Sequence, residues 1–367
     1  QYPTPDRSER WKFLSRYFEI DLPENSSTVG AAQRIHHILR RTCNAHWNQC
    51  RGATDTKGVT GYIVDPTHVR AHSKPVDFTE TCQVPMGKGE EGMYGIKGLQ
   101  KIKISTSHQT TRLFCMVYTH SGAHDKLRAI TDTWGRLCDG FVAASNLTDP
   151  SIGAINLLHE GPERYRNMWS KVRSMWRYVY EHYRHDYDLF HIGGDDHYII
   201  PSNIRYMIGF ENWNLTKPLF IGGSLPLNNK RRYCNGGSGY TLNAAALRLF
   251  IEDLFDKPSC MPHLQTSKED MMVASCFRSV GIQCMDTNDF RNETRYHTWN
   301  VDQHTAWNKD KPAQKWKLLV NHHGIAWLEG LGQISETSTS FHLKNPDVNT
   351  TDMGMRRYHA NLYGHCT

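Results

Sequence analysis

Apolar residues form short runs and helical stripes from about residue 111 onward. The apolar run 113–118 has the length of a buried strand, and 141–144 and 187–192 repeat that pattern. A polar turn at 120–122 and a helix reaching Trp134 are predicted after the first run. Before the third run, large side chains recur every three or four residues, as in an amphipathic helix: Trp169, Val172, Trp176, Val179 and Tyr183. Strands alternating with helices predict an α/β fold, with helices on both faces of a mostly parallel sheet.

The first hundred residues follow a different pattern. They are rich in Gly, Thr, Lys and His, and they contain one good helical stretch, from Ser27 to about Thr42. Three cysteines lie among them: Cys43, Cys50 and Cys82. We interpret residues 1–105 as a disulfide-stapled extension packed on a core domain at 106–345, which a tail at 346–367 follows.

Composition narrows the class of protein. The chain of 367 residues is 38% hydrophobic, which is enough for a sizeable core and excludes disorder as a description of the whole. No apolar run approaches the roughly 18 residues of a membrane span. The net charge of +6 is spread along the chain without a stripe of Lys and Arg, so we expect no nucleic-acid partner.

Cysteines and glycosylation sequons indicate the compartment. The 10 cysteines include no Cys-x-x-Cys pair, which argues against a zinc ribbon. Five sequons accompany them, at Asn25, Asn146, Asn214, Asn292 and Asn349. Together they favour the oxidising, glycosylating secretory pathway. Because the chain starts with Gln rather than Met, we expect a processed N-terminus, with any signal peptide or membrane anchor outside this sequence.

An acidic turn follows the third predicted strand. Gly193 and Gly194 precede Asp195 and Asp196, two adjacent carboxylates that repel each other unless a cation is near. A divalent ion would relieve the repulsion and could bridge the oxygens of a diphosphate. The alternative is an Asp-rich turn before a helix with Ser202 as its N-cap. This stretch alone does not decide between them.

Further segments carry a resemblance to a known family. In chain order they are 133–138, 167–171, 178–182, 193–196, 235–242, 269–282 and 340–343. They resemble the family-31 glycosyltransferases, first the core 1 β1,3-galactosyltransferases and then Fringe. The likeness keeps its order over about residues 110–345, so the series is more specific than any one segment.

The resemblance implies a Rossmann-like GT-A fold, a nucleotide-sugar donor and a divalent metal, usually manganese. It also implies an inverting transfer that makes a β1,3 linkage. Asp196 and His342 match the metal ligands, Asp195 the carboxylate near the donor's ribose and sugar, and Asp270 the catalytic base. Four further positions are expected to face the donor: Thr119, Arg128, Lys171 and Gly237.

Several of these assignments have alternatives in the residues themselves. Ser267 to Asp270 also fits a capping box that opens a helix, and a lone histidine such as His342 is usually structural. Two disulfides are implied by the resemblance, Cys115–Cys138 and Cys260–Cys276. The other six cysteines allow 15 pairings, and all of these stay open.

The sequence also departs from the family pattern. Gly194 replaces the first Asp of the usual triplet, and His197 stands where a Thr or Val is usual. Core 1 enzymes carry an adjacent Cys pair before the segment that matches residues 340–343, the Phe-His segment, and this pair is absent here. The metal site survives these changes, whereas the choice of donor and acceptor is less certain to carry over.

We therefore predict a manganese-dependent inverting β1,3-galactosyltransferase. It would move galactose from UDP-galactose to a protein-linked sugar of the O-linked N-acetylgalactosamine type, in the lumen of the Golgi or another secretory compartment, as a type II membrane protein in full length. The alternatives are a Fringe-like transfer of N-acetylglucosamine and a non-catalytic chaperone or lectin-like relative. The oligomeric state stays open, with a homodimer as one alternative.

Overall fold

A computed structural model describes residues 98–106, 110–228, 231–308, 328–343 and 351–363. Nearly all of the extension assigned to residues 1–105 lies outside these ranges. The helix and the disulfide staple expected in this extension therefore stay predictions. The pairings of Cys43, Cys50, Cys82 and Cys366, which also lie outside the described residues, stay open. Within the described ranges, no helix combines the length and the apolar character that a membrane span requires.

The centre of the fold is a six-stranded sheet, in the order β3-β2-β1-β4-β9-β6. Its strands are β1 Leu113–Tyr118, β2 Gly140–Ser145, β3 Ala154–Asn156, β4 Leu189–Gly194, β6 Phe220–Gly222 and β9 Tyr240–Asn243. β1 runs parallel to both of its neighbours, β2 and β4, and β3 runs parallel to β2. β9 is antiparallel to β4 and β6. The predicted mostly parallel α/β sheet is confirmed.

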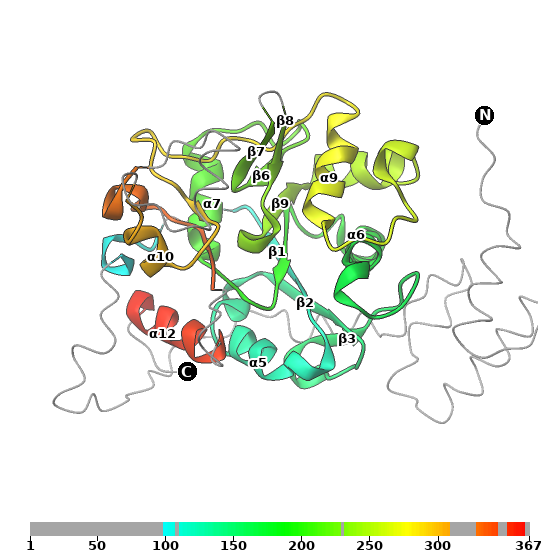
Figure 1. Ribbon diagram of the computed structural model, residues 1–367, viewed down its shortest axis with the longest axis horizontal. Coiled ribbons are helices and arrows are strands. Elements are labelled where there is room, and N and C mark those ends of the chain that lie inside the picture. The colour runs from blue at the N-terminus through cyan, green and yellow to red at the C-terminus, as the bar shows by residue number, and fades with distance from the viewer. Residues whose placement is uncertain (1–97, 107–109, 229–230, 309–327, 344–350, 364–367) are drawn as a thin grey trace, which may run out of the picture.

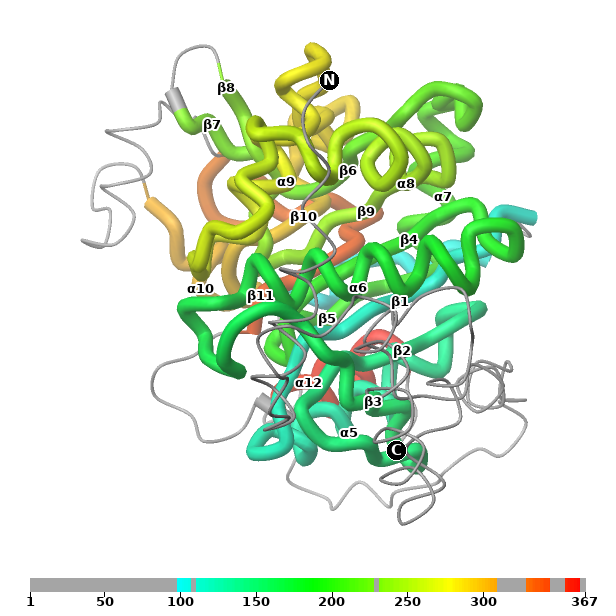
Figure 2. Tube along the Cα trace, turned by 90° about the vertical axis from the view of Figure 1, so that its right-hand side faces the viewer, coloured from blue at the N-terminus to red at the C-terminus, as the bar shows by residue number. Residues whose placement is uncertain are grey.

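Helices cover both faces of this sheet. On one face lie α5 His124–Asp132, α7 Pro201–Phe210 and α12 Thr351–Tyr363, and on the other α6 Met168–Tyr183, α8 Ala244–Leu249 and α9 Glu269–Arg278. Figure 1 shows α7 and α12 to the left of the strands and α6 and α9 to the right. In Figure 2, α6 crosses the viewer's side of β1 and β4, with α8 and α9 above it.

The apolar run at β1 is continuous because both faces of the strand are buried. Phe114 and Met116 pack in the layer of α6, while Cys115 and Val117 pack in the layer of α5. Successive side chains of a strand point to opposite faces, so a strand between two helical layers needs an apolar residue at every position.

Two boundaries differ from the prediction. α5 ends at Asp132, and Trp134 opens a separate 3₁₀ turn, because the backbone of Thr133 leaves the helical region (φ −114°, ψ −109°). β4 begins at Leu189 rather than 187 and runs on to Gly194. The acidic turn therefore follows directly on the last residue of the strand.

Two smaller sheets complete the fold. β5 His197–Ile199, β10 Tyr296–His297 and β11 Ser340–His342 form a sheet in the order β10-β11-β5, and β7 Ser224–Asn228 pairs with β8 Arg231–Cys234 in a hairpin. α10 Val301–Thr305 lies between β10 and β11 in the chain. β11 runs antiparallel to β5 with His342 opposite His197. This register returns the Phe-His segment to the side of the acidic turn.

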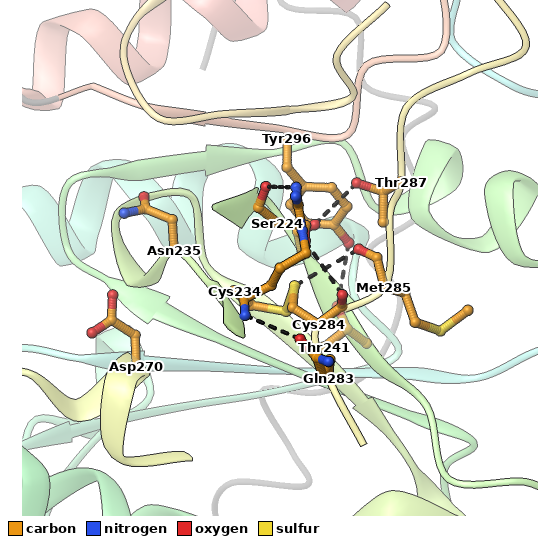
Figure 3. The surroundings of a disulfide bond; sticks show 12 residues. Ser224, Cys234, Asn235, Thr241, Asp270, Gln283, Cys284, Met285, Thr287 and Tyr296 are labelled. Carbon is orange, nitrogen blue, oxygen red and sulfur yellow. Dashed lines mark hydrogen bonds between the residues drawn. A yellow bond between two sulfur atoms is a disulfide. The ribbon is translucent and has the colours of Figure 1, made fainter. Parts of the chain in front are cut away.

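Three disulfides join the described cysteines. Cys115–Cys138 and Cys260–Cys276, implied by the family resemblance, are both present. The third, Cys234–Cys284, was one of the open pairings, and it fastens the end of β8 to the segment after α9. Figure 3 shows Asn235 and Asp270 together on one side of this bridge. The sequon asparagines within the described ranges, Asn146, Asn214 and Asn292, are exposed.

Candidate active site

The acidic turn connects the central sheet to the small one. β4 ends at Gly194, Asp195 and Asp196 form the turn, and β5 begins at the next residue. Gly194 has no room for a side chain, because a Cβ there would lie 2.9 Å from Asp196 Oδ1. Ser202 is not the N-cap of α7: it lies inside the helix, after Pro201, whose fixed φ suits the first helical position.

Asp195 is held at the carboxyl end of β1. Thr119 donates its hydroxyl hydrogen to Asp195 Oδ2 at 2.7 Å, and Lys126 Nζ lies 3.3 Å from Oδ1. Burial raises the pKa of Asp195, and the charge of Lys126 and the Thr119 hydroxyl oppose that shift. The structure thus brings together Thr119 and Asp195, two residues that the sequence assigned to the donor.

The cation of α5 that contacts Asp195 is Lys126, which the sequence analysis missed, and the contact of Arg128 with a donor stays a prediction. The two residues are two positions apart, which is about 200° around a helix, so they face nearly opposite directions. Arg128 is exposed, and the titratable groups that its charge reaches are His124 and Asp149.

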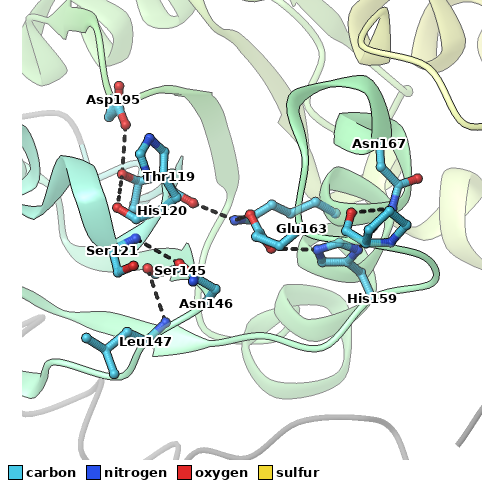
Figure 4. A network of polar contacts seen from close by, with 12 residues as sticks. Thr119, His120, Ser121, Ser145, Asn146, Leu147, His159, Glu163, Asn167 and Asp195 are labelled. Carbon is cyan, nitrogen blue, oxygen red and sulfur yellow. Dashed lines mark hydrogen bonds and ion pairs between the residues drawn. The ribbon is translucent and has the colours of Figure 1, made fainter. Parts of the chain in front are cut away.

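Lys171 is buried, with 2% of its surface exposed, and bonds the protein rather than facing solvent. Its ammonium donates to the carbonyl of Thr119 and pairs with Glu163. Burial alone would raise the pKa of Glu163, but the hydrogen bond from His159 and the charge of Lys171 outweigh it and lower that pKa to about 2. Figure 4 shows Thr119 between Asp195 and Glu163. Lys171 therefore fixes the end of β1, and its direct contact with a donor stays a prediction.

Asp196 and His342 meet across the β5–β11 pair. His342 Nε2 lies 3.2 Å from Asp196 Oδ2, and its Nδ1 lies 3.0 Å from the carbonyl oxygen of Thr298. A carbonyl only accepts, so Nδ1 carries a hydrogen; Nε2 donates to Asp196 when the ring is protonated, and in the neutral ring its lone pair is available to a metal ion. Burial would raise the pKa of Asp196, but the hydrogen bond and charge of His342 prevail and lower it to about 2.

This pair suits a divalent cation that is shared with a substrate. An imidazole nitrogen and a carboxylate oxygen are a donor set that manganese accepts, and a backbone carbonyl that fixes the other ring nitrogen is typical of metal-binding histidines. Among the described residues, no group of three or more His, Cys, Asp or Glu side chains could hold a metal. Two protein ligands leave coordination positions that diphosphate oxygens and water would fill.

Two consecutive glycines, Gly236 and Gly237, connect the Asp196–His342 pair to Asp270. The 3₁₀ turn Gly236–Ser238 lies between β8 and β9, and the N–H of Gly236 donates to Asp270 Oδ2 at 2.9 Å. A Cβ on Gly237 would lie only 2.4 Å from His342 Nδ1. The sequence analysis expected Gly237 to allow a close approach to the donor sugar. The close approach in the structure is to the imidazole of His342.

Asp270 is the second residue of α9, and its carboxylate is bound by backbone. Oδ1 accepts from the N–H of Met271 at 2.8 Å, and Oδ2 from Gly236. Burial raises the pKa of Asp270, and these two hydrogen bonds oppose the shift. The capping box is wrong: the N-cap position is Lys268, without a side-chain cap, so Ser267 lies one residue too early.

Glu269 is a site residue to which the sequence analysis gave no role, although it stands in the matching segment. It is buried, and its two carboxyl oxygens accept from Tyr118 at 3.1 Å and from Tyr240 at 3.3 Å. Burial, followed by the charge of Asp270, raises the pKa of Glu269 well above its ordinary value. Tyr118 directly precedes Thr119, so Glu269 ties the start of α9 to the end of β1.

His197, the departure from the usual Thr or Val, supports the acidic turn from inside. Its Nδ1 donates to the carbonyl of Gly194, and its Nε2 lies 3.3 Å from Nε2 of the buried His191. His191 Nδ1 is 2.9 Å from the Thr241 hydroxyl oxygen. Burial lowers the pKa of His197 to about 4, so the ring is neutral near pH 7. His197 therefore supports the acidic turn through the carbonyl of Gly194, and Asp196 and His342 are in contact despite this departure from the family pattern.

Comparison with known proteins bears on the family and on the class of reaction. The sequence matches no protein-family model. It is 26% identical over 256 residues to the glycoprotein-N-acetylgalactosamine 3-beta-galactosyltransferase 1 of Xenopus laevis, an alignment that covers 69% of this chain and 68% of that relative. The resemblance to family-31 glycosyltransferases is confirmed, and the similarity to a galactosyltransferase supports glycosyl transfer as the reaction class.

Proposed function

We propose that this relative of the family-31 glycosyltransferases transfers galactose from UDP-galactose, with inversion and with manganese, to a sugar on a protein. The acceptor class follows the relative's name, which specifies N-acetylgalactosamine on a glycoprotein. The exposed sequons and the disulfides support a secretory compartment, and we propose the Golgi lumen.

One observation carries the proposal: neighbouring glycines contact the candidate base and the candidate metal ligand. Gly236 bonds Asp270, and Gly237 packs against His342, so both chemical groups flank a single turn. Residues far apart in the sequence converge there, from α9, β11 and the end of β4. A candidate metal ligand and a candidate proton acceptor at one turn support the proposal, because an inverting transfer needs a charge that stabilises the leaving diphosphate and a base for the attacking hydroxyl.

In the proposed reaction, the acceptor's hydroxyl oxygen attacks the anomeric carbon of the donor sugar while the bond from that carbon to the diphosphate oxygen breaks. Asp270 takes the hydroxyl proton as the new bond forms. Its raised pKa makes it a better proton acceptor than an exposed carboxylate, and Gly236 and Met271 orient its two oxygens. Inversion in one step needs no covalent intermediate, so it needs no protein nucleophile.

The residues around the acidic turn would bind the donor. Asp196 and His342 would hold the metal, with Thr298 fixing the imidazole ring through its carbonyl. Manganese, when bound, supplies positive charge that stabilises the departing diphosphate. Thr119 and Lys126 hold Asp195 in the turn, and the ammonium of Lys126 adds positive charge beside the donor.

The proposal is tested by incubating the purified protein with manganese and each of several UDP-sugars, and by measuring released UDP. We expect UDP-galactose to be hydrolysed fastest, and excess chelator to stop the reaction. Fastest hydrolysis of UDP-N-acetylglucosamine would instead favour the Fringe-like alternative. Hydrolysis of none, with or without glycopeptide acceptors, would favour a non-catalytic relative.

Replacing Gly237 with alanine should disturb the Asp196–His342 pair by a steric clash, without removing either side chain. The added methyl group would collide with the His342 ring, which must then move away from Asp196. We expect turnover to fall about 10- to 100-fold, as for loss of a group that orients a metal ligand, and the manganese concentration for half-maximal rate to rise. The matched control is Gly332→Ala, whose methyl group would meet only Leu328 at 3.8 Å. Equal manganese dependence in both variants would contradict the prediction.

A further inference from the structure

Tyr165 is a large, exposed aromatic side chain in the loop before α6. It opens the 3₁₀ turn Tyr165–Asn167 that leads into α6, and 70% of its surface is exposed. Burial of part of the side chain, followed by the charges of Asp196, Glu269 and Asp270, raises the pKa of Tyr165. Its phenol therefore lies within electrostatic reach of the candidate metal ligand and of the candidate base.

The loop that carries Tyr165 is attached to the donor side of the site. Glu163, two residues earlier, pairs with Lys171, and Lys171 bonds the carbonyl of Thr119. His159 donates to the other Glu163 oxygen at 2.7 Å (Figure 4). Since Thr119 holds Asp195, these contacts bring the loop to the end of β1 where the donor is proposed to bind.

A second set of contacts attaches the same loop and the start of α6 to the segment before α9, the helix that carries the candidate base Asp270. The N–H of Trp169 donates to the carbonyl of Thr266 at 3.0 Å, three residues before α9 begins. Trp169 Nε1 donates to the carbonyl of Met261 at 3.0 Å, and His263 Nδ1 lies 2.8 Å from Glu160 Oε2. Tyr165 thus stands on a short segment that is fixed on both sides.

The loop is also braced internally. Asn167 Nδ2 donates to the carbonyls of Glu160 at 2.6 Å and of Pro162 at 3.1 Å. Gly161 has a φ of +77°, and a Cβ there would lie 2.8 Å from that same amide nitrogen. Contacts of this kind hold an exposed ring in one place, so less side-chain and loop entropy is lost when a ligand packs on it.

The chemistry of the proposed transfer indicates which ligand would pack on the ring of Tyr165. A general base must be within hydrogen-bond reach of the proton that it removes, so the acceptor's reacting hydroxyl lies against Asp270. The acceptor's sugar ring would then extend from Asp270 towards exposed side chains, and Tyr165 is an exposed side chain whose phenol the charge of Asp270 reaches. A pyranose presents C–H groups on its less polar face, and an aromatic ring offers a flat apolar surface with a polar phenol at its rim.

We propose that Tyr165 binds the acceptor, with the pyranose ring of the acceptor sugar packed on its aromatic face. The inference rests on the proposed function and extends it from the reaction class to the binding of the second substrate. Tyr165 contributes to acceptor affinity, and the donor binds without it.

The test compares Tyr165→Ala with wild type in two measurements. The first is binding of a threonine glycopeptide carrying one N-acetylgalactosamine, followed by ligand-observed NMR. The second is turnover, with KM for the glycopeptide and the rate of UDP-galactose hydrolysis without acceptor measured separately. We expect acceptor Kd and KM to rise about 3- to 10-fold, the range of an aromatic contact, with UDP affinity and donor hydrolysis unchanged.

Further variants make the result specific. Tyr165→Trp and Tyr165→Phe keep a flat ring and should bind the glycopeptide within about twofold of wild type. The control is Phe210→Ala, an exposed aromatic (54%) at the end of α7 on the opposite face of the sheet, which should change neither measurement.

Three outcomes would overturn the inference: equal acceptor binding by Tyr165→Ala and wild type, no glycopeptide binding by wild type, or a loss of UDP affinity, which would place the uracil ring there. Because binding is measured apart from turnover, a protein that hydrolyses no donor would refute the proposed function while the role of Tyr165 is still decided.

Discussion

Replacing Asp270 with asparagine should lower the rate of sugar transfer by at least about 100-fold while the protein stays folded. An amide cannot take the proton of the acceptor hydroxyl, and a positioned general base contributes about 10²–10⁴-fold in rate. Asparagine keeps one oxygen for Met271 or Gly236, but its NH₂ group cannot accept from the other N–H. One lost hydrogen bond costs about 1 kcal/mol of stability, so Tm should fall by a few degrees at most.

A control is needed to separate a role of Asp270 as a base from a purely structural role. The control is a carboxylate that is likewise the second residue of a helix. Asp302→Asn alters an exposed carboxylate in the first turn of α10, and it should leave rate, UDP affinity and Tm unchanged. Asp270→Asn should differ from it in rate by at least about 100-fold while binding UDP equally well. If Asp270→Asn retains transfer within a few-fold of wild type, this carboxylate only orders the turn at Gly236.

Replacing Asp196 with alanine should abolish the manganese dependence of UDP binding. The remaining imidazole of His342 is too weak a site for the ion alone, so calorimetry should give the same low UDP affinity with manganese and with excess chelator. Turnover should fall by at least about 100-fold, because several kcal/mol of charge stabilisation are lost and about 1.4 kcal/mol corresponds to a factor of ten.

Wild type measured with and without chelator is the reference for this variant. Its UDP affinity should drop on chelation to the level of Asp196→Ala, which links the metal to that carboxylate. Among the described residues, Asp196→Ala loses the hydrogen bond with His342 and weaker charge interactions with His197 and Lys126, so its Tm should stay within a few degrees of wild type. Equal UDP affinity of wild type with manganese and with chelator would show that the pair binds no metal of importance to the donor.

The fold was predictable where burial decides the residue type. β1 lies between two helical layers, so its apolar run is continuous, and α6 buries one stripe at helical spacing. The acidic turn was predictable as a turn, because Gly and Asp favour turns after a strand, whereas its role at the site was indicated by the family resemblance. The contact of Asp196 with His342 was expected from family resemblance alone, since no local pattern relates residues 146 positions apart.

What could not be predicted depended on helix phase and on close packing. Lys126 rather than Arg128 reaches Asp195 because two residues on one helix face different directions, and the sequence does not say which direction meets the turn. The approach of Gly237 to His342 depends on the docking of two separate elements. The N-cap at Lys268 differs by one residue from the best sequence motif, which is the usual precision of such boundaries.

The pairing of β11 with β5 has a consequence for how the enzyme matures. β5, which follows the acidic turn, is made early in synthesis, whereas His342 comes from β11 near the end of the chain. Contacts between distant segments form only after the loop between them closes, which carries an entropy cost. A nascent chain that has completed α9 therefore contains the candidate base Asp270 and the acidic turn but lacks His342, the second candidate metal ligand. On the proposed function, the ability to bind the metal would arise in one late step, when β11 pairs with β5.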